Sequence, residues 1–155
     1  IHLLDILIFF CGDFLTVKSF ISNKFWSFRV EDNAYSLIKF KNNVIAMIHS
    51  TATQWQHKFR VEIIMEKGQI NLNGILSGSK SYGDEKIEII PKFTKKNKKG
   101  RLVSFKKDLS WDRETKEFIN ALKKNQKIKT GNIEDAKRVM NLVDKIYKSD
   151  KSWKY

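Results

Sequence analysis

The first twelve residues are almost continuously apolar, and they predict a helix that ends at Gly12. His2 and Asp5 interrupt this run three residues apart, which places both on one stripe of the helix, about one turn from each other. A helix that is apolar nearly all round is typically buried, so we expect this polar stripe to face a site that uses it. Because the run begins at Ile1, apparently inside the helix, we expect the chain to be a fragment of a longer protein.

The pattern then becomes strand-like, with β-branched and aromatic residues or with alternating apolar and polar positions. Lys41-Asn42-Asn43 predicts a hairpin turn, because asparagine tolerates positive φ, and Lys67-Gly68 predicts a second turn. Residues 74–83 are a Gly/Ser-rich loop. The strand-like segments are residues 16–21, 24–30, 34–40, 44–50, 57–66, 69–73, 86–93 and 102–107.

The last third of the chain predicts two helices. Phe118, Ile119 and Leu122 form the apolar face of the first helix. Asn132 is the expected N-cap of the second helix, with Asp135 at the capping-box position. The apolar stripe of this second helix contains Ala136, Val139, Met140, Val143, Ile146 and Tyr147.

The order of a helix, a run of strands and two helices predicts a single α+β domain over residues 1–155, with a largely antiparallel open sheet and helices on one face. The strands at 36–40, 44–50 and 61–65 carry apolar residues at both parities. This pattern indicates that both sheet faces are buried, and hence that the protein is an oligomer.

Composition removes several classes of function. The apolar start lacks a basic leader and a cleavage site, and is far shorter than the ~20 residues that span a bilayer, so we expect neither a signal peptide nor a membrane anchor. The single cysteine, Cys11, excludes an internal disulfide and fits a reducing cytoplasm. One cysteine and three scattered histidines give no metal-ligand spacing, so no metal is expected.

The net charge of +13 makes binding to nucleic acid or another anion an alternative. Only five of the 30 basic residues are arginine, and lysine is also the ordinary solvated surface residue, so nucleic acid is not the favoured partner. The densest basic run, residues 92–101, predicts a solvated loop or hairpin tip, with a functional anion patch as the alternative.

Six segments, in order, resemble the C-terminal domain of the Gfo/Idh/MocA oxidoreductases, named for glucose–fructose oxidoreductase, inositol dehydrogenase and a rhizopine-catabolism protein. The resemblance covers almost the whole chain. The segments are His2-Leu3-Leu4-Asp5, Val30-Glu31-Asp32-Asn33-Ala34, Ser50-Thr51-Ala52-Thr53-Gln54-Trp55, Glu66-Lys67-Gly68, Ser81-Tyr82-Gly83-Asp84-Glu85 and Glu117-Phe118-Ile119-Asn120-Ala121-Leu122, followed by the helix from Thr130-Gly131 to Tyr147.

The resemblance implies a fold similar to the second domain of glyceraldehyde-3-phosphate dehydrogenase, next to an N-terminal Rossmann domain that is missing here and binds NAD or NADP. It implies a cytoplasmic dehydrogenase that transfers hydride between this cofactor and a sugar or nucleotide-sugar, with a lean towards bacterial surface-polysaccharide sugars. It also implies a homodimer or homotetramer formed through the sheet face. The isolated fragment is expected to be inactive.

His2 matches the histidine of the family's catalytic group, whose lysine and aspartate would precede Ile1. An imidazole can hold or relay the hydroxyl proton, so His2 is the expected general acid/base, or orients the substrate hydroxyl. A buried structural histidine is the alternative reading, and a non-catalytic dimerisation domain is the alternative for the whole chain. Asp5 is more readily explained as a structural anchor.

Three further side chains are candidates for binding the sugar. Gln54, Trp55 and Tyr82 lie at strand ends or in the Gly/Ser-rich segment, where a sugar ring could stack and hydrogen-bond. A structural role is the alternative for each. His49 and His57 flank the segment without an evident partner, and we interpret both as structural or exposed.

Overall fold

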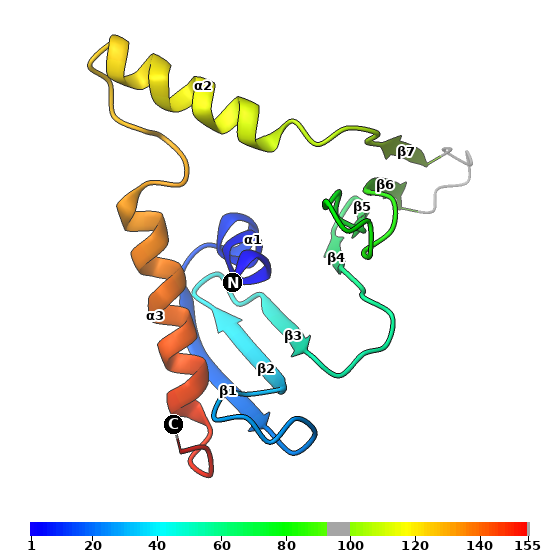
Figure 1. Cartoon of the computed structure of the whole chain (residues 1–155), viewed down its shortest axis with the longest axis vertical. Helices are drawn as coiled ribbons and strands as arrows, with labels where there is room; N and C mark the ends of the chain where they lie inside the picture. The colour runs from blue at the N-terminus through cyan, green and yellow to red at the C-terminus, as the bar shows by residue number, and fades with distance from the viewer. Residues whose placement is uncertain (93–99, 155) are drawn as a thin grey trace. The chain divides into compact units, whose positions relative to one another are not determined.

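The structure, a computed structural model, describes residues 1–92 and 100–154 (Figure 1). The chain divides into two compact units, residues 1–53 with 127–155 (unit 1) and residues 54–126 (unit 2). The elements are α1 (His2–Cys11), β1 (Phe14–Ser22), β2 (Asn33–Phe40), β3 (Ile45–Thr51), β4 (Arg60–Met65), β5 (Gly68–Asn73), β6 (Lys86–Pro91), β7 (Arg101–Ser104), α2 (Ser110–Lys123) and α3 (Ile133–Ser149).

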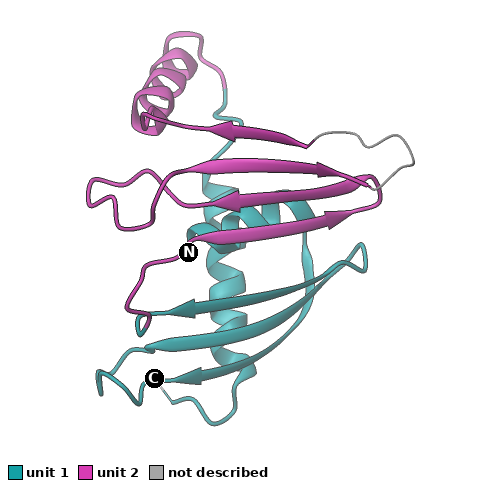
Figure 2. Cartoon of the chain, turned by 90° about the vertical axis from the view of Figure 1, so that its right-hand side faces the viewer, with its two compact units in different colours: residues 1–53, 127–155 teal, residues 54–126 magenta. Residues whose placement is uncertain are grey.

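Unit 1 is a three-stranded antiparallel sheet in the order β1-β2-β3, with α1 and α3 packed on one face (Figure 2). Alternate residues of β2 point into this interface, and Ile38 and Phe40 are fully buried there. Leu4 and Ile8 of α1 meet them, which explains why one stripe of α1 is buried. The core is completed from α3 by Val139, Leu142 and Ile146.

The end of α3 is attached to the free edge of β1. Ser149 Oγ donates to Val17 O at 2.9 Å and accepts from Ser19 N–H at 3.2 Å. Ser19 Oγ donates to Ile146 O at 2.5 Å, and Asp150 accepts from Ile21 N–H at 2.8 Å. Backbone groups that face outwards on an edge strand are therefore satisfied by side chains.

The opposite face of this sheet is apolar and open. Strand register places Phe20 beside Tyr35, and Leu37 beside Met47, on the side away from the helices. All four are exposed, Met47 to 80%. The prediction that both faces are buried is thus met on one face by this chain, while the other is available to a partner.

Unit 2 contains a four-stranded antiparallel sheet in the order β4-β5-β6-β7, shown in magenta in Figure 2. Val61, Ile63, Ile70 and Leu72 alternate with polar residues along β4 and β5, which is why these segments form strands with one apolar face. None of the residues of α2 is buried, although its apolar face formed as predicted.

The α+β class with antiparallel pairing is confirmed, with the strands in two hydrogen-bonded sheets where the sequence indicated one. Several boundaries differ: β4 begins at Arg60, so His57 precedes the strand, and β7 ends at Ser104. Most of the basic run, residues 93–99, lies outside the described residues.

The strand predicted at residues 24–30 is wrong. This segment is a turn, and Ser27 has a φ of 57°. The cause is Asp32, which is 4% exposed and accepts hydrogen bonds from Phe25 N–H at 2.7 Å and Trp26 N–H at 3.2 Å. These two amides are bound to a carboxylate and are not paired with a neighbouring strand.

Two predictions about helices also need correction. The first helix is not buried nearly all round, because Phe9 and Phe10 are exposed and only Leu4 and Ile8 are buried. The predicted stripe of the last helix omitted its best-buried residue, Leu142, and included Met140, which is exposed. The Asn132 N-cap and its capping box with Asp135 are confirmed.

Candidate functional site

His2 occupies the first turn of α1. The carbonyl of Ile1 accepts from the backbone N–H groups of Leu4 (3.0 Å) and Asp5 (3.1 Å), which fixes this turn. The side chain of His2 is exposed, while Leu4 anchors the helix in the core. An imidazole held on a packed helix and open to solvent can exchange a proton with a bound molecule. Its surroundings do not match the alternative of a buried structural histidine.

Asp5 is exposed in the same first turn. A carboxylate at this position interacts favourably with the positive end of the helix dipole and with its unpaired N–H groups. This accounts for Asp5 without any contact to a substrate. This interaction within α1 is enough to explain Asp5 as a structural residue.

Tyr82, predicted to bind sugar, lies in a cluster of side chains in unit 2. Its ring is 5.1 Å from the ring of His57, at an interplanar angle of 49°. His57 Nδ1 shares a hydrogen bond of 3.0 Å with Ser81 Oγ, and Ser81 Oγ shares one of 2.8 Å with Ser79 Oγ. The cluster presents two aromatic rings beside a row of hydroxyl groups, a combination that suits stacking and hydrogen bonding to a polyhydroxylated ring.

The loop that carries Tyr82 depends on Gly74. This residue has a φ of 71°, and a Cβ there would lie 2.2 Å from the carbonyl oxygen of Asp84. Glu85 also accepts from the backbone N–H of Leu76 at 3.0 Å, across the base of the loop. Close backbone approach therefore closes the loop, and only glycine permits it at this position.

Gln54 and Trp55 lie in the segment between β3 and β4, and both are exposed, Trp55 to 87%. They belong to unit 2 together with Tyr82, whereas His2 belongs to unit 1. Tyr82 is therefore in contact with His57 in unit 2. His2 lies in unit 1, at the start of α1.

Both histidines interpreted as structural or exposed have partners that the sequence did not reveal. His49 stacks on Tyr35, with ring centroids 4.0 Å apart and planes at 10°, and its Nε2 lies 3.3 Å from Asn33 Oδ1. His57 contacts Ser81 and Tyr82 as described. The hairpin register of β2 and β3 could have indicated the first pair; a contact 24 residues away along a loop leaves no periodic signal.

Asp32 lies in residues 30–34, one of the segments that resemble the family, and it fixes the turn just before this segment through hydrogen bonds to Phe25 and Trp26. Burial acts to raise its pKa, but hydrogen bonds from Phe25 N–H, the Asn33 amide, Trp26 N–H and the Ser22 hydroxyl outweigh burial and lower it. A carboxylate with this many donors stays ionised and acts as a fixed acceptor. Asp32 is therefore a structural residue that shapes the turn at residues 24–30.

Neither a metal centre nor a dinucleotide pocket is built from the part of the chain that the structure describes. No three His, Cys, Asp or Glu side chains of the described residues approach closely enough to hold a metal ion. All strand pairs there are antiparallel, so these residues form no parallel βαβ unit of the kind that binds NAD. No helix among the described residues has the length and apolar character required to cross a membrane.

Comparison with known proteins bears on the first 71 residues and on the fold. Residues 1–71 match the family model of the GFO/IDH/MocA C-terminal domain. The search of curated proteins gave no match.

Solved structures share the fold along nearly the whole chain. UDP-N-acetylglucosamine 3-dehydrogenase GnnA from Acidithiobacillus ferrooxidans is 13% identical, with a TM-score of 0.78 over 97% of this chain and 45% of that chain. Levoglucosan dehydrogenase in complex with NADH and levoglucosan is 16% identical, with a TM-score of 0.76 over 96% of this chain and 46% of that chain. The WlbA dehydrogenase from Bordetella pertussis, in complex with NADH and UDP-GlcNAcA, is 15% identical, with a TM-score of 0.68 over 96% and 40%. This chain spans less than half the length of each.

Proposed function

Because the resemblance of this chain to the C-terminal domain of the Gfo/Idh/MocA oxidoreductases is confirmed, we propose that the chain is the substrate-binding and oligomerisation domain of a cytoplasmic, NAD(P)-dependent sugar or nucleotide-sugar dehydrogenase. The observation that carries the proposal is the family match over residues 1–71, the segment that begins with the exposed His2. The shared fold with dehydrogenases that bind NADH and sugars supports the same class of reaction.

The dinucleotide belongs to a domain that this chain does not form, so we assign to the chain the acid–base and binding roles alone. Oxidation of a secondary alcohol releases the hydroxyl proton, and a positioned base must take it. His2 is the proposed group, either as the general base or as the side chain that orients the hydroxyl. Its place on a rigid helix fits this role, because small displacements of a catalytic group are costly.

The aromatic and hydroxyl cluster around Tyr82 is the proposed sugar subsite. Tyr82 and His57 offer ring faces, while Ser81 and Ser79 offer hydroxyl groups that can donate and accept. Gln54 and Trp55 are proposed as further contacts from the same unit. Exposure of these side chains in the isolated chain is consistent with a pocket that the substrate and the missing domain complete.

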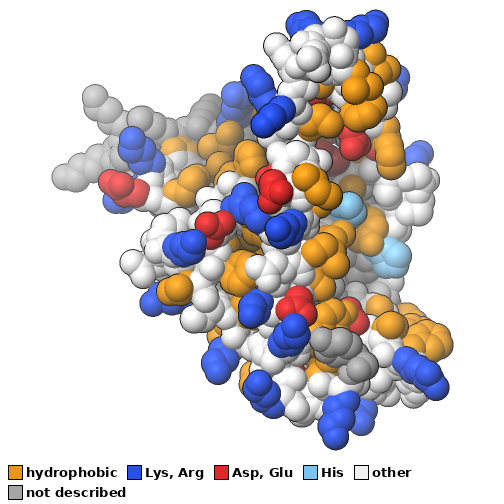
Figure 3. Space-filling model, turned by 90° about the vertical axis from the view of Figure 1, so that its left-hand side faces the viewer, with side chains coloured by type: hydrophobic (Ala, Val, Ile, Leu, Met, Phe, Trp, Pro, Cys, Tyr) orange, Lys and Arg blue, Asp and Glu red, His pale blue; other side chains and the backbone are white. Residues whose placement is uncertain are grey.

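The open apolar face of β1–β2–β3 is the proposed surface for a homodimer or homotetramer. Exposed side chains of three strands lie next to each other there, including Phe20, Leu37 and Met47. Adjacent exposed apolar side chains of this kind are typical of protein interfaces. Figure 3 shows the opposite side of the molecule from Figure 2, and therefore not this sheet face. There, Lys and Arg side chains appear at many separate points with hydrophobic side chains between them, so this view does not favour the alternative of a nucleic-acid module.

The test uses the full-length protein with NAD+ or NADP+ and a panel containing levoglucosan and UDP-N-acetylglucosamine. We expect His2→Ala to lower turnover by roughly 10²-fold or more, because a positioned acid–base group contributes about this factor. Lys137→Ala is the control and should leave turnover unchanged, since Lys137 is an exposed residue of α3 outside both the first turn of α1 and the open sheet face.

Two results would count against the proposal. Unchanged turnover of His2→Ala at saturating sugar would remove His2 from proton transfer while leaving the dehydrogenase assignment intact. Absence of any nicotinamide reduction with the wild-type protein across the sugar panel would favour the alternative of a non-catalytic dimerisation domain.

A further inference from the structure

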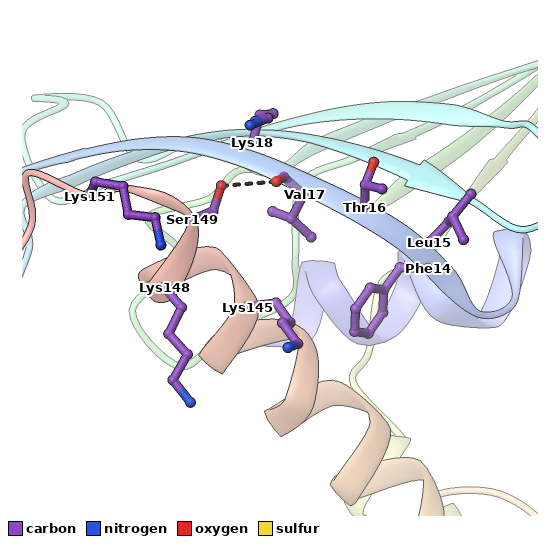
Figure 4. Close-up of a pocket in the computed structure, with 9 residues that line it drawn as sticks. All are labelled: Phe14, Leu15, Thr16, Val17, Lys18, Lys145, Lys148, Ser149 and Lys151. Atoms are coloured by element: carbon purple, nitrogen blue, oxygen red, sulfur yellow. Dashed lines mark hydrogen bonds between the residues drawn. The ribbon is translucent and has the colours of Figure 1, made fainter.

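A hollow of about 420 Å³ lies between β1 and the C-terminal end of α3, entirely within unit 1 (Figure 4). Phe14 and Val17 point from β1 towards α3 and form its apolar wall. Lys145, Lys148 and Lys151 line it from the end of α3 and the residues that follow. Lys18 is part of the lining as well, but its side chain projects from the other side of the strand. The volume falls within the range of small-molecule sites.

The walls of the hollow are fixed to each other by hydrogen bonds. Ser149 bridges Val17 and Ser19 of β1, as described above, and Ser19 Oγ bonds in turn to the carbonyl of Ile146. The helix end is therefore held at a set distance from the strand, and the lysines that flank Ser149 leave from a fixed backbone. A ligand that enters has to order only the lysine side chains, because the backbone that carries them is already fixed.

Carboxylates near the hollow neutralise only part of its charge. Lys148 Nζ pairs with Asp144 at 2.9 Å. Asp150 is occupied by Ile21 N–H and by the backbone N–H and hydroxyl of Ser152. Among the described residues, no carboxylate forms an ion pair with Lys145 or Lys151.

The negative end of the α3 dipole offers a partial explanation for these lysines, since cations near a helix C-terminus are favourable. It does not explain why they border a hollow with an aromatic wall. Figure 4 shows the side chains of Lys145, Lys148 and Lys151 pointing in different directions, and an anion in the hollow would attract all three ammonium groups towards it.

We propose that this hollow binds a small phosphate-bearing anion, either pyrophosphate or a phosphate ester. Lys145 and Lys151 supply the charge, and Lys148 can turn from Asp144 towards the ligand. Phe14 and Val17 give the organic part of an ester an apolar surface. The site lies in unit 1, is independent of the proposed dehydrogenase chemistry, and needs no residue from the sugar subsite.

The test is a titration of this chain, labelled with ¹⁵N, with inorganic pyrophosphate and separately with glycerol phosphate, followed by NMR at low salt. We expect saturable shifts confined to the amides of residues 14–19 and 145–151. Tighter binding of pyrophosphate would identify the free anion as the preferred ligand; tighter binding of glycerol phosphate would identify an ester. Sulfate is the control for non-specific binding of an anion to surface lysines, and it should bind more weakly than either phosphate compound.

Two variants and a control decide the outcome. Lys145→Gln and Lys151→Gln should each weaken pyrophosphate binding by about five-fold, the factor for losing one charge contact at about 4 Å in water. Lys137→Gln, an exposed position earlier on the same helix, should leave the affinity unchanged. All three lysines are exposed, so the variants should keep the wild-type spectrum elsewhere. Shifts that spread over lysines of the whole surface without saturation, equal binding of sulfate, or equal effects of all three variants would each overturn the proposal.

Discussion

Leu142 anchors α3 to the rest of unit 1. Its side chain is 0% exposed and belongs to the same cluster as Ile38 and Phe40 of the sheet and Leu4 of α1. Leu142→Ala removes the side-chain atoms beyond Cβ from the centre of this cluster. Because the surrounding residues come from a sheet and two helices, they cannot all move in to fill the space, and a cavity remains.

The expected cost follows from the size of this change. Buried Leu→Ala substitutions cost about 2–5 kcal/mol, and a fully buried position between three elements belongs near the middle of this range, about 3 kcal/mol. With a urea m-value of about 2 kcal/mol/M for a chain of this size, the unfolding midpoint of unit 1 should fall by about 1.5 M. Met140→Ala is the matched control on the same helix: Met140 is 53% exposed, so its free energy of unfolding should change by no more than about 0.5 kcal/mol.

Urea unfolding followed by circular dichroism measures the midpoint, and hydrogen exchange read by mass spectrometry shows which unit is affected. We expect Leu142→Ala to speed exchange in β1, β2 and α3, with peptides from residues 54–126 unchanged. A midpoint for Leu142→Ala that equals the midpoint for Met140→Ala would refute the assignment of this core.

Three further predictions concern association, pH and the sugar subsite. Leu37→Asp should dissociate the proposed oligomer, because it places a charge in the open apolar face. Ile133→Asp is the control, at a position 78% exposed at the start of α3, and should leave the oligomer intact. Light scattering after size exclusion measures the molar mass, and equal masses for the two variants would contradict the proposed interface. Hydrogen bonds from the Ser152 hydroxyl, Ile21 N–H and Ser152 N–H lower the pKa of Asp150 in the folded state. Its contribution to stability is therefore complete above the unfolded pKa of about 3.9 and is lost as the pH falls through the lower folded value. Urea midpoints taken from about pH 6 down to about pH 3 should then fall less steeply for Asp150→Asn than for the wild type, and parallel curves would contradict this reasoning. In the full-length enzyme, Tyr82→Ala should raise the KM for sugar by about 2- to 10-fold with little change in kcat, as expected for lost ring stacking, and Tyr82→Phe should not; a fall in kcat alone would place Tyr82 outside the subsite.

The parts of the fold that were predictable are those with a local cause. The turn at Lys41-Asn42-Asn43 formed because Asn43 adopts a φ of 66°, and α3 begins at the Asn132 capping box. The alternation of Ile70 and Leu72 with polar residues along β5 likewise follows from the side chains of one strand.

The sequence-based predictions failed where a residue outside the segment decides its conformation or its contacts. Residues 24–30 have the composition of a strand, but the carboxylate of Asp32 takes the amides of Phe25 and Trp26. Leu142 was missed because the stripe was drawn through Met140, and the arrangement of α3 against the sheet decides between them. The partnership of His57 with Ser81 and Tyr82 depends on the path of a loop, which periodicity does not describe.

The attachment of α3 to the edge of β1 has a consequence for the order of events during synthesis. Ser149 and Ser19 are 130 positions apart, and unit 1 consists of both ends of the chain with unit 2 between them. A ribosome releases β1 well before the end of α3, so the side chains that satisfy its outer backbone groups are made about 130 residues later. Unit 2 is continuous and can close its own strand pairs first. Until residues 146–150 emerge, the nascent chain presents an open strand edge, the feature that leads most directly to mispairing with another chain.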